Sequence, residues 1–177
     1  MTQALTDPAI EFMKGQRFGE ALHLLRRAID QDPSQWNAWY MAGQCCRFLN
    51  DIDGAIKHLS RAAELKRDEP PIFLALGIAC QLKTQWDDAI DAFRRAIEID
   101  SDYDLAYNSL AFTQKKRGEL DKALHNYDAG AKALARRIVK AMRNTRTSPI
   151  LKHRDTVGTL WVGYASYAEL HLASSVE

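Results

Sequence analysis

The side chains that could hold a metal ion are scattered along this sequence. A zinc site on one helix needs two histidines four residues apart, so that both face the same side with an acid between them. No two histidines have that spacing, since they stand at His23, His58, His125, His153 and His171. The sequence therefore predicts no metal site.

Residues that could cradle a phosphate or act as a nucleophile also lack the required pattern. No G-x-S-x-G motif occurs, and no glycine-rich loop gathers backbone N–H groups for a phosphate. The glycines are isolated, as at Gly43 and Gly77, or stand near expected helix ends, as at Gly15 and Gly118. We therefore expect no cofactor and no catalysis, unless the chain is one part of a longer protein whose catalytic domain lies elsewhere.

The three cysteines are too few, and odd in number, for a disulfide framework. Cys46 and Cys80 take equivalent inward positions in successive sequence repeats. Cysteine is among the most buried residue types and behaves there as a small hydrophobic side chain. We expect both to fill the core rather than to do redox chemistry.

A set of positions returns at a constant interval of about 34 residues, a period typical of stacked helical hairpins. The interval is marked by Ala21, Ala55, Ala89 and Ala123. Within each interval, one position is always large and another always small: the large residues are Leu5, Trp39, Phe73 and Tyr107, and the small ones Ala9, Gly43, Gly77 and Ala111. Large residues also follow the alanines, at Leu25, Leu59, Phe93 and Tyr127. This pairing indicates closely crossing helices, because a bulky side chain can enter only where the facing backbone is unobstructed.

The pattern resembles the tetratricopeptide repeat, in which W-x2-L-G-x2-Y, A-x3-F and P recur with the same period. Four units match without an insertion: 2–35, 36–69, 70–103 and 104–137. Proline closes only the first unit, at Pro33, and the eleventh position, usually tyrosine, holds Phe12, Cys46, Cys80 and Gln114. We expect Gln114 to weaken the internal contact of the fourth unit, which looks like a terminal repeat.

The resemblance implies an all-α fold, a right-handed α-solenoid of four helical hairpins. In the second unit we expect helices over about 35–49 and 52–65, with the second capped at Asn50-Asp51. In the first unit Pro8 stands where a helix should be under way, and an interior proline costs about 3 kcal/mol. We therefore expect that helix to be short, with Asp7 as N-cap and Pro8 at its first position.

Residues 138–177 form a second region beyond the repeats. The last repeat helix is expected to extend to about Arg143, because apolar residues continue at helical spacing at Leu124, Tyr127, Ala131, Leu134, Ile138 and Met142. A basic linker follows and breaks at Ser148-Pro149. A final amphipathic helix over about 155–173 is expected to cap the open end of the solenoid. Alternatively, this helix binds in the groove or presents Trp161 and Tyr164 to a partner.

Charge is balanced overall but unevenly distributed. The chain has 24 Lys and Arg against 23 Asp and Glu, with 46% hydrophobic residues, as is ordinary for a soluble globular protein. Residues 129–154 contain no acid and eight bases, which are Lys132, Arg136, Arg137, Lys140, Arg143, Arg146, Lys152 and Arg154. We do not expect nucleic-acid binding, because no aromatic residue is interleaved with these bases, and bases near a helix C-terminus also complement its dipole.

No feature of the sequence directs the chain to a membrane. No apolar run approaches the roughly 20 residues of a spanning helix, and the N-terminus lacks the basic and apolar regions of a secretory signal. We expect a cytoplasmic location and no membrane partner.

The resemblance also implies a binding surface, because in the family the first helix of every unit lines a concave groove that holds a peptide. The corresponding residues here are Asn37, Tyr40, Met41, Gln44, Arg47, Phe48, Leu74, Ile78, Gln81, Leu82, Asn108, Phe112 and Lys115. An apolar strip runs through them at Tyr40, Met41, Phe48, Leu74, Ile78, Leu82 and Phe112. A strip of this size predicts an occupant.

One subfamily grips acidic chaperone tails with a cationic clamp, and that mode is not expected here. No cation stands at the corresponding positions, which are Tyr40, Gln44, Ala75, Leu105 and Ser109. We expect instead a non-catalytic protein–protein interaction scaffold that binds an apolar or amphipathic peptide segment of another protein. The alternatives are a self-associating module forming a homo-oligomer, or the interaction domain of a longer enzyme or regulator.

Overall fold

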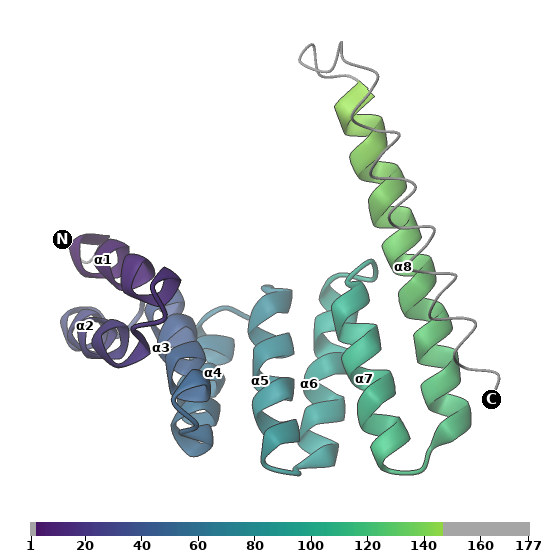
Figure 1. Cartoon of the computed structure of the whole chain (residues 1–177), viewed down its shortest axis with the longest axis horizontal. Coiled ribbons are helices and arrows are strands. Elements are labelled where there is room, and N and C mark those ends of the chain that lie inside the picture. Colours follow the sequence, from purple (N-terminus) through teal and green to yellow (C-terminus); the bar gives the residue numbers. More distant parts are fainter. Residues whose placement is uncertain (1–2, 147–177) are drawn as a thin grey trace. The chain divides into compact units, whose positions relative to one another are not determined.

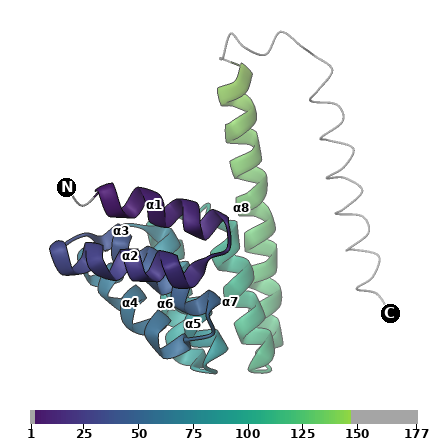
Figure 2. The same ribbon diagram turned by 60° about the vertical axis from the view of Figure 1, so that its left-hand side comes forward.

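The computed structural model describes residues 3–146, and over that range the chain folds into helices joined by short turns. Successive helices form antiparallel hairpins that follow one another side by side (Figures 1 and 2). The helices are α1 Gln3–Lys14, α2 Phe18–Gln31, α3 Trp36–Phe48, α4 Ile52–Leu65, α5 Pro70–Leu82, α6 Trp86–Ile99, α7 Asp104–Lys116 and α8 Leu120–Arg146. The predicted all-α solenoid of four hairpins is confirmed, whereas the predicted capping helix over 155–173 lies outside the described residues.

Residues 1–136 form one compact unit, which contains α1 to α7 and the larger part of α8. From α1 to α7, each helix packs against the next one along the chain. The first helices of neighbouring hairpins also touch, α3 with α5 and α5 with α7. A second unit begins at Arg137 and includes the last turns of α8, which ends at Arg146, slightly beyond the predicted Arg143. Among residues 3–146, no helix combines the length and the apolar composition that a membrane crossing needs.

The crossings inside the second and third hairpins have the predicted pairing of a large with a small residue. A Cβ atom added to Gly43 would lie 2.5 Å from Cγ of Leu59, and one added to Gly77 would lie 2.4 Å from Cε1 of Phe93. Both Leu59 and Phe93 are fully buried. The marker alanines are buried as well, at Ala21, Ala55, Ala89 and Ala123. The repeat spacing in the sequence is therefore the spacing of the close helix contacts.

The turn inside every hairpin contains one residue in the left-handed backbone region. These residues are Gln16 (φ 58°), Asn50 (φ 62°), Thr84 (φ 60°) and Gly118 (φ 81°), and they occupy the same position of each repeat. In the second hairpin the next residue, Asp51, caps α4 by accepting a hydrogen bond from the backbone N–H of Gly54 at 3.0 Å, as predicted. The turn shape repeats although its residue type changes.

The expected start of the first helix is wrong. α1 begins at Gln3 rather than after Asp7, and Pro8 lies inside it. A proline lacks the N–H that would reach the carbonyl of residue 4, and its ring crowds that carbonyl, but at this place both effects fall in the first turn of the helix. The longer helix also includes Leu5, which packs against the core cluster that contains Ala9, and Thr6, which is 4% exposed.

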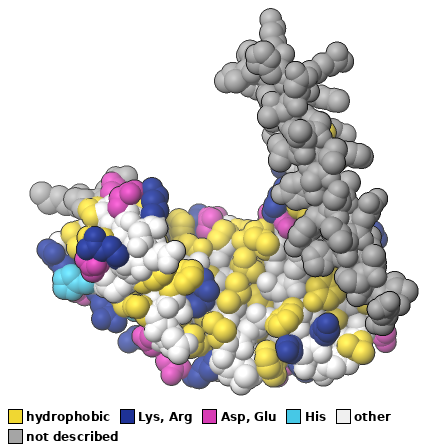
Figure 3. All heavy atoms as spheres, viewed as in Figure 1, with side chains coloured by type: hydrophobic (Ala, Val, Ile, Leu, Met, Phe, Trp, Pro, Cys, Tyr) yellow, Lys and Arg dark blue, Asp and Glu magenta, His cyan; other side chains and the backbone are white. Residues whose placement is uncertain are grey.

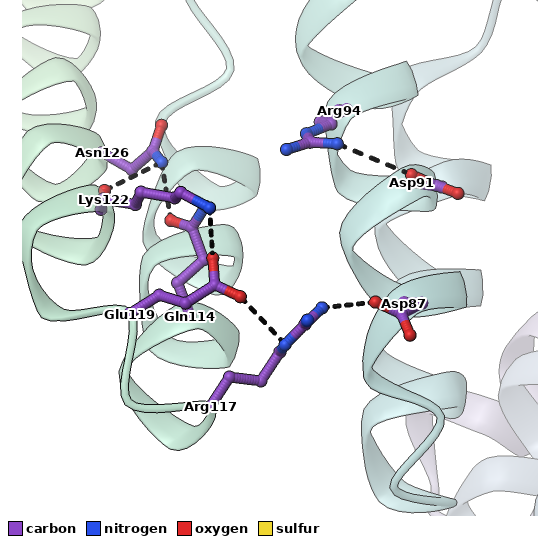
Figure 4. Close-up of polar contacts among 8 residues, drawn as sticks. All are labelled: Asp87, Asp91, Arg94, Gln114, Arg117, Glu119, Lys122 and Asn126. Atoms are coloured by element: carbon purple, nitrogen blue, oxygen red, sulfur yellow. Dashed lines mark hydrogen bonds and ion pairs between the residues drawn. The ribbon is translucent and has the colours of Figure 1, made fainter.

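The expectation that Gln114 weakens the fourth hairpin is also wrong. Gln114 is 2% exposed, and its Oε1 accepts a hydrogen bond from Nδ2 of Asn126 on α8 at 2.7 Å (Figure 4). The Asn126 amide also donates to the carbonyl of Lys122 at 3.1 Å. A polar pair thus joins α7 to α8 where the first hairpin has Phe12 and Leu24 and the third has Cys80 and Ala92.

Ion pairs link consecutive hairpins in a repeated register. Lys83 pairs with Asp53, and Arg117 pairs with Asp87. The second pair occupies the same repeat positions as the first, one repeat later in the sequence. Arg117 also contacts Glu119 at 3.0 Å (Figure 4). These side chains are largely exposed, and exposed pairs contribute only about 0–1 kcal/mol each. They favour the correct stacking of hairpins more than they add stability.

His58 gives the folded chain a predicted dependence on pH. The ring is half-buried beside Trp39, with centroids 5.4 Å apart, and Nδ1 has no hydrogen-bond partner among the described residues. Burial, followed by the charges of Arg26 and Lys57, lowers the pKa of His58 below 6.5. Between the folded pKa and 6.5 the unfolded chain binds more protons, so the free energy of unfolding should fall as pH falls through this window.

Urea unfolding of the wild type and of His58→Gln at about pH 7.5 and about pH 5.5 measures this effect. We expect the loss of stability on acidification to be smaller in the variant. Because the other histidines and the acids are common to both proteins, equal losses would contradict the prediction.

Candidate peptide-binding surface

The candidate surface consists of the thirteen predicted residues on the first helices of the second, third and fourth hairpins, α3, α5 and α7. None of them is fully buried. The exposed members are Asn37, Phe48, Leu82, Asn108, Phe112 and Lys115, and the half-buried members are Tyr40, Met41, Gln44, Arg47, Leu74, Ile78 and Gln81. Figure 3, in the view of Figure 1, shows hydrophobic side chains gathered over α5 and its neighbours. Peptide binding by these residues stays a prediction.

Fewer residues of the apolar strip are exposed than the sequence suggests. Met41 and Tyr40 pack against one buried cluster of the core, and Leu74 and Ile78 pack against another. The most exposed members are Phe48, Leu82 and Phe112, with exposed fractions of 54%, 56% and 46%. These three side chains, one from each helix, are the apolar contacts that a partner could cover.

Polar contacts fix one row of side chains along α3. Gln44 Nε2 donates to the hydroxyl oxygen of Tyr40 at 3.1 Å, and Arg47 Nε donates to Gln44 Oε1 at 3.2 Å. The Arg47 guanidinium lies 4.3 Å from the centre of the Phe48 ring, which stacks on Phe18 of α2 with centroids 4.4 Å apart. Arg47 and Phe48 are therefore held in place before any ligand binds.

Gln81 makes hydrogen bonds within the fold. Its Nε2 donates to the carbonyl of Ser109 at 3.2 Å and to the hydroxyl of Thr113, both on α7. Thr113 is fully buried. The amide of Gln81 thus joins α5 to α7, and we expect it to offer little to a partner.

Two apolar residues outside the thirteen predicted residues extend the exposed apolar area. Leu105, at the start of α7, is 49% exposed, and Ile10 on α1 is 37% exposed. Ile10 lines a hollow of about 600 Å³ between α1 and α3, whose lining also includes Thr6, Asp7, Asn37 and Met41. The repeat register could have identified both, because they take the same repeat positions as other members of the surface.

Two adjoining hollows of about 480 and about 390 Å³ lie over α4, α5 and α6 and share Phe73, Leu76, Ser60 and Arg95. One repeat earlier, Trp39 stands in the place of Phe73, and its Nε1 donates to the carbonyl of Pro33 at 2.9 Å. The second hollow is also lined by Cys80, Asp88 and Asp91, which belong to no group of three side chains arranged for a metal ion among the described residues.

The cysteines are unsuited to thiolate chemistry. Cys45, Cys46 and Cys80 are free and buried. Burial raises the pKa of Cys45 to about 11 and that of Cys46 to about 11, with smaller contributions from the neighbouring thiol and from Asp51 respectively. The thiols are therefore protonated at neutral pH. The described residues contain no group of three histidine, cysteine or acidic side chains arranged for a metal ion.

Comparisons with known proteins agree with the repeat architecture. A family model described as a tetratricopeptide repeat matches residues 7–70, and another described as a TPR repeat matches residues 82–118. Protein bimA of Emericella nidulans is 29% identical over 113 residues, which are 64% of this chain and 14% of that protein. The chain thus spans about a seventh of the length of the curated relative it matches.

Solved structures share the fold at low sequence identity. A crystal structure of MamA superposes with a TM-score of 0.75 at 20% identity, over 77% of this chain and 80% of that one. MamA from Desulfovibrio magneticus RS-1, from residue 41 to its end, superposes with a TM-score of 0.71 at 15% identity, over 75% of each chain. At these identities the likeness extends to the fold alone.

Proposed function

The chain is a tetratricopeptide-repeat protein, and from this we propose that it is a non-catalytic scaffold that binds a peptide segment of another protein on the candidate surface. Helical repeats of this kind support protein interaction in general. One observation carries the finer proposal: three consecutive first helices each expose a large apolar side chain, at Phe48, Leu82 and Phe112. An apolar or amphipathic segment would cover them.

The energetics favour such an occupant. Burying apolar surface stabilises a complex by about 25 cal/mol per Å², and aromatic side chains contribute the largest areas. The Arg47–Phe48–Phe18 stack is already ordered, so little side-chain entropy is lost when a partner covers it. An amphipathic helix laid across repeated helices would use contacts at regular spacing along one face.

Affinity capture with the intact chain tests the proposal. We expect the double variant Leu82→Asp/Phe112→Asp to fold normally, because both side chains are exposed. Its affinity for partners should fall by more than about tenfold, because a complex would bury unpaired carboxylates. Ile78 is a poorer site for this change, since it packs against the core. Val139→Asp on α8 is the matched control, because Val139 is 47% exposed and lies on another helix. Capture of the same partners by all three proteins would contradict the proposal.

Self-association is a second candidate function, supported by the apolar side of α8. Leu120, Leu124 and Tyr127 are 64%, 71% and 38% exposed and follow one another at helical spacing. A second copy of the chain could cover this stripe. Sedimentation of the wild type should then show a dimer that dissociates on dilution and that Leu124→Asp abolishes, whereas a monomer at all concentrations would exclude this function.

A further inference from the structure

We infer that the segment bound on the candidate surface is acidic, with Asp or Glu side chains beside its apolar ones. The inference rests on the proposed function and specifies the charge of its ligand. It is based on the distribution of charged residues among the helices of the repeats.

The three helices of the candidate surface have almost no acid. α3 contains one charged residue, Arg47, and α5 contains none. α7 contains Asp104, Lys115 and Lys116, and Asp104 is 5% exposed. The charges that these helices expose to a partner are therefore all positive.

Several cations elsewhere in the repeats are paired with acids, whereas Arg26, Arg27, Lys57 and Arg67 are in no ion pair among the described residues. On the second helices, Arg61 contacts Glu64 at 2.7 Å and Arg95 contacts Glu98 at 3.0 Å. Between hairpins, Lys83 and Arg117 pair with aspartates. Within residues 3–146, no ion pair involves Arg47, Lys115 or Lys116 either, and these three are the only cations on α3, α5 and α7. Their charge is left for a ligand.

Two of these cations stand beside the apolar side chains that the ligand would cover. The Arg47 guanidinium lies over the Phe48 ring, and Nζ of Lys116 lies 5.5 Å from the centre of the Phe112 ring. Gln44 binds only Nε of Arg47, so the terminal amino groups of the guanidinium have donors for a carboxylate. A segment in which acids neighbour apolar residues would satisfy both kinds of group at once.

Helix dipoles account for part of this arrangement but not for all of it. The three cations stand in the last turns of α3 and α7, where they complement the helix C-terminus. This effect does not explain why α3 and α5 contain no acid along their whole length. Exclusion of acids from one face is what electrostatic complementarity to an acidic partner requires.

A protein segment fits these groups better than a nucleic acid. A phosphate backbone carries closely and regularly spaced charges and needs a matching row of cations. Here the uncharged α5 separates Arg47 from the two lysines of α7, and exposed Leu82 stands on it. The cations also stand at the helix ends rather than at the clamp positions of the chaperone-tail binders, so a free terminal carboxylate is not required.

Three helical peptides with one apolar face and a different polar face test the inference by fluorescence anisotropy. The polar face is Glu, Gln or Lys, and both ends are blocked. We expect the Glu peptide to bind at least about tenfold more tightly than the Lys peptide at about 0.05 M salt, with a smaller difference at about 0.5 M salt. Lys115→Gln/Lys116→Gln should reduce this preference. Arg27→Gln/Arg67→Gln, which removes the same charge from sites elsewhere, should leave it unchanged.

The outcomes distinguish an error about the charge of the ligand from an error about the binding surface. Equal binding of the three peptides, lost in Leu82→Asp/Phe112→Asp, would overturn the acidic ligand and leave the proposed surface intact. Binding of the Glu peptide that survives Leu82→Asp/Phe112→Asp would overturn both. Absence of binding by all three peptides, or displacement of the Glu peptide by single-stranded DNA at the same lysines, would overturn the inference.

Discussion

Replacing Gly77 by alanine is expected to lower the free energy of unfolding by about 1–3 kcal/mol. The new Cβ would lie 2.4 Å from Cε1 of Phe93 and within 2.8 Å of two further ring atoms. Phe93 is fully buried between α5 and α6, so its ring cannot move aside without disturbing the crossing. Urea unfolding monitored by circular dichroism measures the change.

Gly19→Ala is the matched control for this substitution. Gly19 lies in the first turn of α2, and a Cβ atom added there would meet no atom within 4 Å. Alanine should be neutral or stabilising by up to about 1 kcal/mol, because glycine is the poorer helix former. Equal unfolding curves for the two variants would contradict the tight crossing at Gly77.

The first hairpin suggests how the crossing at Gly77 can be rescued. Its equivalent positions hold Ala9 and Leu25, which are both fully buried. Adding Phe93→Leu to Gly77→Ala reproduces that pair and should recover part of the lost stability. The double-mutant cycle formed by Gly77→Ala, Phe93→Leu and their combination is expected to give a coupling energy of about 0.5–3 kcal/mol.

Replacing Asn126 by leucine is expected to cost about 1–3 kcal/mol, because it leaves the buried Oε1 of Gln114 without its hydrogen bond. Gln114→Leu alone should cost less, since the half-buried Asn126 amide keeps its bond to the Lys122 carbonyl. The double variant should be more stable than Asn126→Leu, because it replaces the polar pair by apolar side chains, as in the first hairpin, which has Phe12 and Leu24 at these positions.

Thermal and urea unfolding of the three variants measure this order. The expected ranking places Asn126→Leu below both Gln114→Leu and the double variant. A double variant less stable than Asn126→Leu would contradict this order. It would mean that losing the whole polar pair costs more stability than leaving Gln114 without its partner.

The features that could be predicted from the sequence are those that recur in every repeat. Gly77 opposite Phe93 and Gly43 opposite Leu59 follow from spacing alone, because four aligned units make a chance pattern improbable. The Asp51 cap is equally local, since it depends on one side chain and the third backbone N–H beyond it. The burial of Cys46 and Cys80 follows from the same register.

The features that could not be predicted depend on what lies opposite a single residue. Gln114 looked destabilising because its partner Asn126 has no counterpart in the repeat pattern. Pro8 looked like a helix start because propensity does not include the surface that a longer α1 buries. Tyr40, Met41, Leu74 and Ile78 were expected on the binding surface, but the pattern does not indicate how far each side chain turns toward the core.

The contacts between neighbouring hairpins also determine how the chain can acquire its structure. α1 to α7 contact the helices next to them, and the hydrogen bond from Arg136 on α8 to the carbonyl of Ser101 spans 35 residues. Such a topology has a low contact order, so folding need not wait for distant parts of the chain to meet. Any adjacent pair of hairpins can nucleate it, and growth then proceeds outward one hairpin at a time. On the ribosome, α1 to α4 can therefore reach their native contacts before α7 and α8 have been synthesised.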